Sequence, residues 1–147
     1  MPHIRTQVRD AAVAALTGLA STGARVFANR LRVLTAADLP CVLVNTDDEV
    51  VDYVTMHEPA LLERTLELTV RGVARAVSGL DVVLDQIALE VEQALATSLL
   101  GGLIKDAPTL VRISFEDEAL LDKPVGVITL TFAIKYQMAS GSPDVAL

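Results

Sequence analysis

Residues Leu62 to Ala74, with the sequence LERTLELTVRGVA, show the clearest alternation of apolar and polar side chains in the chain. The apolar set is Leu62, Leu66, Leu68, Val70, Gly72 and Ala74, and the polar set is Glu63, Thr65, Glu67, Thr69 and Arg71. Arg64 is the exception, because it falls among the apolar positions. A period of two places each set on one face of a β-strand. The stretch therefore predicts a strand with one buried face and one face that meets water or a partner.

The segments around this strand predict two helices and five further strands. Apolar residues recur at three- and four-residue steps over residues 3–20, and again from Ser78 to the Gly101-Gly102 pair, which predicts helices. Ser78 and Asp81 resemble a capping box at the start of the second helix. Extended segments are expected at residues 24–34, 41–45, 50–56, 109–116 and 125–136. The carboxylate-rich residues 45–49 and 116–123 are expected to form loops between strands.

This order of elements, α-β-β-β-β-α-β-β, predicts an α+β fold. Short connections favour a largely antiparallel sheet of about six strands, and the two helices cover one of its faces in a two-layer sandwich. Residues 1–139 are expected to form a single domain, and residues 140–147 a flexible tail. The outward row of the last strand, which includes Val127 and Thr131, is more apolar than solvent requires. Either a partner or a helix of the same chain could cover it.

Composition and charge exclude several classes of protein. A chain of 147 residues with 52% hydrophobic and 3% aromatic residues has an aliphatic core, and it buries roughly two-thirds of its unfolded surface. Residues 1–37 carry a balance of +4 and the rest −11, which gives the net charge of −7. An acidic body argues against wrapping DNA. The basic residues in 1–37 form either a solvated surface or a positive face that contacts an acidic face of a neighbouring copy.

No segment of the sequence reads as a membrane span or a signal peptide. Charged residues interrupt every apolar run before the roughly 20 residues that a spanning helix needs. Arg9 and Asp10 stand where a signal peptide needs apolar residues. We therefore expect synthesis in the cytoplasm, where the lone thiol of Cys41 is ordinary.

The sequence offers no motif for catalysis, a cofactor or a metal. It lacks a phosphate-binding P-loop and a Gly-x-Ser-x-Gly elbow. One cysteine and two histidines leave little for a metal cage. Cys41 and His57 could form a nucleophile and base, but the apolar strand around Cys41 favours an inert buried thiol. We expect a protein that is not an enzyme and carries no cofactor.

The densest acidic cluster consists of Asp47, Asp48, Glu49 and Asp52. It lacks the regular ligand spacing and the glycine of a calcium loop, and nothing marks a glycosidase-like pair. The ordinary interpretation is a solvated hairpin tip. The functional interpretation is a negative loop that lines or rims an opening.

Taken end to end, about residues 3–137 resemble the tail-terminator proteins of long-tailed bacteriophages, of the minor tail protein U type. The likeness lies in an opening helix, IRTQVRDAAVAAL, that runs into TGARVF, and in the stretch LPCVLVNTDDE. It continues in the strand LERTLELTV, the helix DQIALEVEQAL and the closing strand PVGVITLTF. The order of elements agrees with the predicted two-layer fold.

The resemblance implies a structural role in the virion, at the neck of the tail. Such proteins form a ring, usually of six copies, on the head-proximal end of the tail tube. The ring stops polymerisation of the tube protein and presents the surface that docks to the head–tail connector. DNA then passes through the ring without specific binding, and no membrane is involved.

Two hypotheses on residues accompany this implication. Asp47, Asp48, Glu49 and Asp52 would lie near the lumen or at an axial rim, where negative charge leaves the DNA backbone unbound. Arg25, Arg30 and Arg32 would contact acidic positions on the adjacent subunit. The alternatives are another phage neck or head-completion ring protein, and a small cytoplasmic ligand-binding domain that uses the acidic hairpin.

Overall fold

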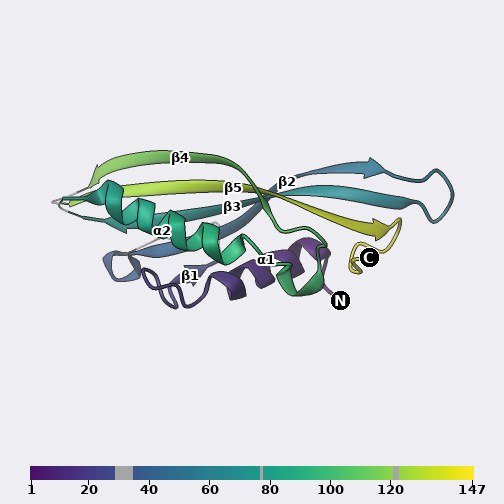
Figure 1. The fold of residues 1–147 in the computed structure, drawn as a ribbon, viewed down its shortest axis with the longest axis horizontal. Helices are drawn as coiled ribbons and strands as arrows, with labels where there is room; N and C mark the ends of the chain where they lie inside the picture. Colours follow the sequence, from purple (N-terminus) through teal and green to yellow (C-terminus); the bar gives the residue numbers. More distant parts are fainter. Residues whose placement is uncertain (29–34, 77, 121–122) are drawn as a thin grey trace.

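The computed structural model describes residues 1–28, 35–76, 78–120 and 123–147. These residues form two α-helices that lie on one face of a five-stranded sheet (Figure 1). The predicted α+β class, with helices layered on one side of the sheet, is confirmed. The sheet has five strands and not six.

The sheet has the order β1-β2-β3-β5-β4. Its strands are β1 (Val26–Phe27), β2 (Cys41–Tyr53), β3 (Leu61–Arg75), β4 (Thr109–Leu120) and β5 (Lys123–Ala139). The helices are α1 (Ile4–Leu16) and α2 (Leu80–Leu95). Only β1 runs parallel to its neighbour, so the described sheet is largely antiparallel, as the short connections predict.

The turn expected at residues 45–49 is wrong, because residues 41–53 form the single strand β2. Between the pairs Thr46–Leu68 and Glu49–Leu66, Asp47 and Asp48 face the single residue Glu67 of β3. This two-against-one arrangement is a β-bulge, which absorbs an extra residue without ending the ladder. Two predicted strands thereby become one, which accounts for the difference in strand number.

Four other predicted boundaries differ in the structure. Of the strand expected at 24–34, the structure describes β1, and residues 29–34 lie outside the described residues. Helix α2 has Gly79 at its N-cap with no side-chain hydrogen bond, so the capping box at Ser78 is wrong. The same helix ends at Leu95, before the glycine pair. The backbone of residues 116–120 continues β4, so the acidic loop expected there is mostly strand.

The core lies between the helices and the apolar rows of β3 and β5. The alternation on β3 is confirmed, since Leu66, Leu68 and Val70 are fully buried. Gly72 lets α2 approach the sheet: a Cβ there would stand 2.6 Å from Cγ2 of Ile87. The close contact of the helix with this strand therefore depends on the missing side chain.

The hairpin that connects β2 to β3 projects beyond the helix layer (Figure 1). We call residues 50–59 the arm. Every residue of the arm except Thr55 is exposed. Its loop end is closed by a hydrogen bond of 2.8 Å from Val54 N to Leu61 O and another of 2.8 Å from Leu61 N to Thr55 Oγ1. The arm is thus an ordered hairpin with little of its surface covered by the rest of the chain.

Residues 140–147 run back along the domain. Pro143 O accepts a hydrogen bond of 2.9 Å from Ile4 N at the start of α1, and Asp144 O accepts one of 2.9 Å from Gln7 Nε2. Leu147 N donates to Gln137 O of β5 over 2.9 Å. These contacts place the last residues against α1 and β5.

Candidate functional site

A cluster of charges around the buried side chain of Glu49 joins the base of the arm to α1 and β5. The bulge at Asp47 and Asp48 shifts the alternation of β2 by one residue, so Glu49 pairs with Leu66 and points to the helix layer. There its carboxylate lies 3.0 Å from the Arg5 guanidinium and 3.5 Å from that of Arg64. The side chain of Glu49 is only 6% exposed, so the ion pairs are shielded from solvent on its side.

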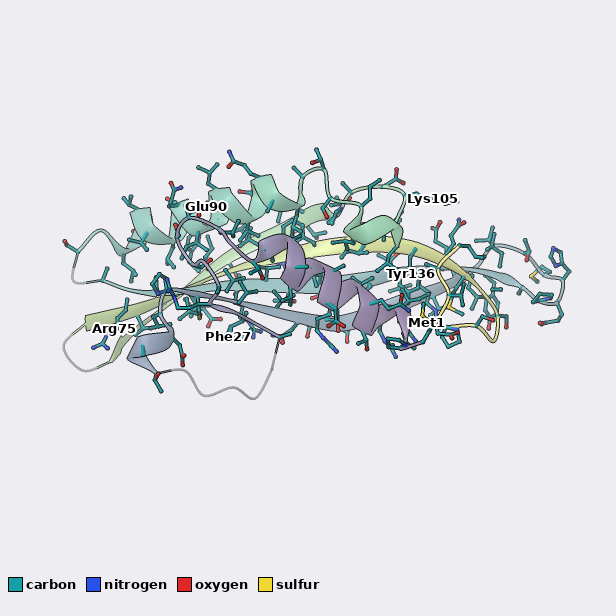
Figure 2. All side chains as sticks on the ribbon, turned by 90° about the horizontal axis from the view of Figure 1, so that it is seen from below. Met1, Phe27, Arg75, Glu90, Lys105 and Tyr136 are labelled. Carbon is teal, nitrogen blue, oxygen red and sulfur yellow. The ribbon has the colours of Figure 1, made fainter. Side chains whose placement is uncertain are left out.

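Tyr136 completes this cluster from β5. Its hydroxyl donates a hydrogen bond to Glu49, and in Figure 2 the ring lies beside the N-terminal end of α1. Burial, followed by the hydrogen bond and the negative charge of Glu49, raises the pKa of Tyr136 to about 12. The phenol therefore stays protonated at neutral pH and serves as a fixed donor.

His3 caps α1 next to the same cluster. Its Nδ1 accepts a hydrogen bond of 3.1 Å from Arg5 N, which requires a neutral ring. Burial and the nearby Arg5 charge lower the pKa of His3 below its usual value of 6.5. The contacts of Glu49 with Arg5, Arg64 and Tyr136 make the cluster a structural tie between α1, β2, β3 and β5.

The four predicted acids do not gather in one loop. Asp47 is half-buried and accepts a hydrogen bond from the Thr69 hydroxyl, and Glu49 is buried in the charge cluster. Asp48 and Asp52 are exposed, and Asp52 pairs with Glu63 on the sheet face away from the helices. The solvated hairpin tip expected for these residues is wrong for Asp47 and Glu49, because the bulge keeps them inside the ladder.

Sequence reasoning missed the partners of Glu49. Arg5, Arg64 and Tyr136 come from three different elements, and no local motif connects them. The one available signal is Arg64, the cation that interrupts the apolar row of β3. A cation at a core-facing position needs a partner when it is buried, and Glu49 provides one.

Of the three arginines predicted at a subunit interface, the structure describes Arg25. Its Nε donates to Pro40 O over 2.7 Å, so it ties the segment before β1 to the start of β2. Its Nη2 lies 3.4 Å from Ser21 O. Arg30 and Arg32 lie outside the described residues. An interface role for the three residues stays a prediction.

The sheet face away from the helices carries the β-branched row of β5. Val127, Thr129, Thr131 and Ala133 lie half-buried on it. Both described helices pack on the opposite face (Figure 1). Within the described part of the chain, a helix therefore does not account for the apolar character of this row.

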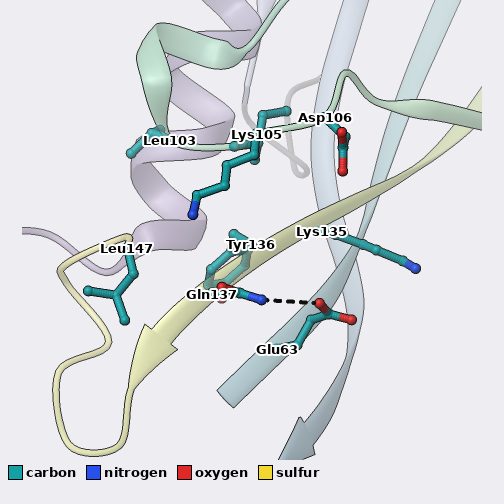
Figure 3. A pocket seen from close by; sticks show the side chains of 9 residues that line it. Glu63, Leu103, Lys105, Asp106, Lys135, Tyr136, Gln137 and Leu147 are labelled. Carbon is teal, nitrogen blue, oxygen red and sulfur yellow. Dashed lines mark hydrogen bonds between the residues drawn. The ribbon is translucent and has the colours of Figure 1, made fainter. Parts of the chain in front are cut away.

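Two hollows lined by described residues are both small. One holds about 90 Å³ between Leu103, Lys105, Tyr136 and Leu147, with Gln137 Nε2 donating to Glu63 over 3.4 Å at its wall (Figure 3). The other holds about 210 Å³ between Asp48, Glu67 and Arg112 on the open sheet face. Pockets for small organic ligands usually hold about 300–1,000 Å³, so neither hollow favours a ligand-binding domain.

The two residues considered as a nucleophile and base are far apart. Cys41 is buried at the start of β2, whereas His57 is exposed on the arm at the other end of that strand. The 13 residues of β2 span roughly 40 Å when extended, so the pair cannot react together. Among the described residues, no three His, Cys, Asp or Glu side chains group so as to hold a metal ion. No helix within the same residues is long and apolar enough to cross a membrane.

Comparison with solved structures finds chains of similar fold, and one of them can be described. Neither a family model nor a curated protein matches this sequence. A chain in a structure described as the virion of a native gene transfer agent particle aligns with a TM-score of 0.42 and 16% identity. The alignment covers 90% of this chain and 92% of that chain.

Proposed function

We propose that this protein is a structural subunit of a phage-like virion, and that it acts as a tail terminator. In this role it forms a ring on the head-proximal end of the tail tube, ends polymerisation of the tube protein and joins the tail to the head–tail connector. The sequence resemblance to such proteins supports the proposal, and so does the agreement of its element order with the fold. The observation that carries the proposal is the exposed arm.

The arm presents large apolar side chains that the chain itself does not cover. Tyr53 is 68% and Met56 94% exposed, and Val50, Val51 and Val54 are exposed beside them. Single exposed apolar residues are ordinary on protein surfaces. Five of them on one projecting hairpin are typical of a surface that other subunits cover. A protein that works in a ring needs such a surface.

Exposed acids give the proposed ring its electrostatic character. Asp48 and Asp52 are the solvent-exposed members of the predicted set, so the lumen or rim assignment rests on them. Asp47 stands behind them, whereas the negative charge of Glu49 is offset by Arg5 and Arg64. Acidic walls do not hold a polyanion, so DNA would pass without binding. In the same proposal, Arg25, Arg30 and Arg32 face acidic positions of the adjacent subunit.

The oligomeric state of the purified protein tests whether it forms a ring. Mass photometry and negative-stain microscopy of the purified protein should show a ring of about six subunits in equilibrium with the monomer. The double variant Tyr53→Ser/Met56→Ser should shift this equilibrium to the monomer at least tenfold. The matched control is Val82→Ser on α2, a residue that is 71% exposed but lies outside the arm. Monomers under every condition, or an equal loss in the control, would contradict the proposal.

A second measurement separates a terminator from another neck ring. A terminator added to polymerising tail-tube protein should bind one end of each tube and stop its growth. A neck or head-completion ring should leave tube growth unchanged and bind the portal end of filled heads. Tube length distributions by electron microscopy distinguish the two outcomes.

A further inference from the structure

We propose that the arm strand of one copy pairs with the outer edge of β4 in the next copy, so that the sheet continues from subunit to subunit. This inference rests on the proposed self-assembly, and it names the surfaces that meet. Both ends of the described sheet leave backbone hydrogen-bonding groups unpaired, and both carry exposed apolar side chains.

The first free edge is that of β4, the last strand in the sheet order. Its inner edge pairs with β5, and no strand formed by the described residues pairs with its outer edge. Val111 is 60%, Ile113 40% and Phe115 54% exposed. A long edge strand with apolar side chains is a template for a further strand, because its unpaired N–H and C=O groups accept one directly.

The second free edge is that of β2 in the arm. β1 pairs with β2 only at Val42 and Leu43, and no other described strand lies along its outer edge toward Tyr53. The strand there is held in place by its ladder with β3, so it is already extended before any partner arrives. An extended, ordered strand loses little conformational freedom when it pairs.

Side-chain direction makes the two edges compatible. Ile113 pairs with Leu130 and therefore points to the helix face, whereas Arg112 pairs with Thr131 and points to the open face. In the arm, Val51 pairs with Arg64 and points to the helix face, whereas Asp52 pairs with Glu63 and points to the open face. Each edge thus offers an apolar side chain on one face and a single charge on the other.

One antiparallel register forms favourable side-chain pairs on both the helix face and the open face of the continued sheet. With Val51 opposite Ile113, Asp52 stands opposite Arg112, so an apolar pair and an oppositely charged pair form together. From Thr109 to Phe115, Arg112 is the only charged residue, and acidic residues follow at 116–118. In this register Asp48 approaches Glu116, so charges beyond Phe115 do not add to the pairing. The orientation follows from strand direction: β2 and β4 run in opposite directions within one sheet, so a next copy with its helices on the same side presents its β2 antiparallel to β4.

The contact joins two different edges, so it is heterologous and leaves the same two edges free at the ends of any open chain. A heterologous contact generates a closed ring if the rotation between copies closes, and a filament if it does not. The occupant of the β4 edge is accordingly a second copy of this chain.

Charge exchange between the two edges tests the inference. Arg112→Asp and Asp52→Arg should each weaken assembly at least tenfold in mass photometry, and the double variant should restore it. Arg71→Asp is the matched control, because Arg71 is also exposed on the same face but lies on the interior strand β3. Thermal melting of each variant should match that of the unmodified protein, which shows that folding is retained.

Disulfide formation provides a second readout. An Asp52→Cys variant mixed with an Arg112→Cys variant should give a mixed dimer on mild oxidation, because opposed Cβ atoms in a ladder lie within reach of a disulfide. Asp52→Cys mixed with Arg71→Cys should not. Rings that persist in both single charge variants would overturn the edge pairing and leave the proposed function standing. Mixed dimers or filaments without rings would support the pairing and contradict the ring. No assembly and no mixed dimer would overturn both.

Discussion

Replacing Glu49 by glutamine tests whether the charge cluster holds the arm to the helix layer. The amide keeps the size of the side chain and can still accept a hydrogen bond from the Tyr136 hydroxyl, but it removes the negative charge that contacts both Arg5 and Arg64. Breaking a buried ion pair by removing one partner costs about 3–5 kcal/mol. Arg64 is 17% and Arg5 46% exposed, so water solvates the two unpaired guanidinium groups in part and reduces this cost. We expect a loss of about 2–3 kcal/mol in the free energy of unfolding.

Urea and thermal unfolding followed by circular dichroism measure this loss. At this chain length about 2–4 °C are lost per kcal/mol, so the melting temperature should fall by about 5–10 °C. Adding Arg64→Gln should recover part of the loss, because it removes the stranded cation. The control Asp48→Asn changes the exposed neighbouring carboxylate and should stay within about 0.5 kcal/mol of the unmodified protein. A loss below about 0.5 kcal/mol for Glu49→Gln would refute the reasoning.

Three further predictions concern the core and its titrating groups. Gly72→Ala should cost about 1–3 kcal/mol in urea unfolding, because the new Cβ would stand 2.6 Å from Ile87 Cγ2; a neutral result would mean that α2 can move outward freely. Because the pKa of Tyr136 is raised to about 12, stability should be complete below pH 10 and fall by about 2–3 kcal/mol up to pH 12. In urea unfolding at a series of pH values, the unfolding free energy of Tyr136→Phe should lack this fall between pH 10 and pH 12. An equal fall in the variant and the unmodified protein would contradict the assignment of the fall to Tyr136. Burial raises the pKa of Glu90, but hydrogen bonds from Ser21 outweigh it and leave the pKa below its usual 4.5. The stability that this carboxylate provides is therefore present above pH 4.5 and lost on acidification. Below pH 4.5 the unfolding free energy of Glu90→Gln should therefore depend less on pH than that of the unmodified protein.

Much of the fold could be predicted from local patterns. The alternation around Leu66 reports which face of β3 is buried, and the three- and four-residue steps from Ile4 to Leu16 report the buried side of α1. These signals are strong because each follows from the geometry of a single element. Helix and strand boundaries were less accurate. Gly79, and not Ser78, stands at the N-cap of α2, so hydrogen-bonding residues near a helix start do not determine which residue caps it.

The candidate site could be predicted only in part. Acidic residues at 47–52 stand out in the sequence, but their directions depend on the bulge, and a bulge is set by pairing with a strand about twenty residues away. A shift of one residue turns every following side chain to the other face. Glu49 is therefore buried among arginines while Asp48 and Asp52 reach solvent. The exposed arm likewise shows only once the helices are seen to end before it (Figure 1).

The sequence by itself determined the α+β class, the aliphatic core and the buried faces of the principal elements, because those depend on periodicity and composition within short windows. It also determined the acidic balance of the body. Only the tertiary structure decided that residues 41–53 are one strand, that Glu49 meets Arg5, Arg64 and Tyr136, and that the arm is uncovered. Those features arise from contacts between residues distant in sequence, where the position of one strand against another sets each side chain's direction and neighbours.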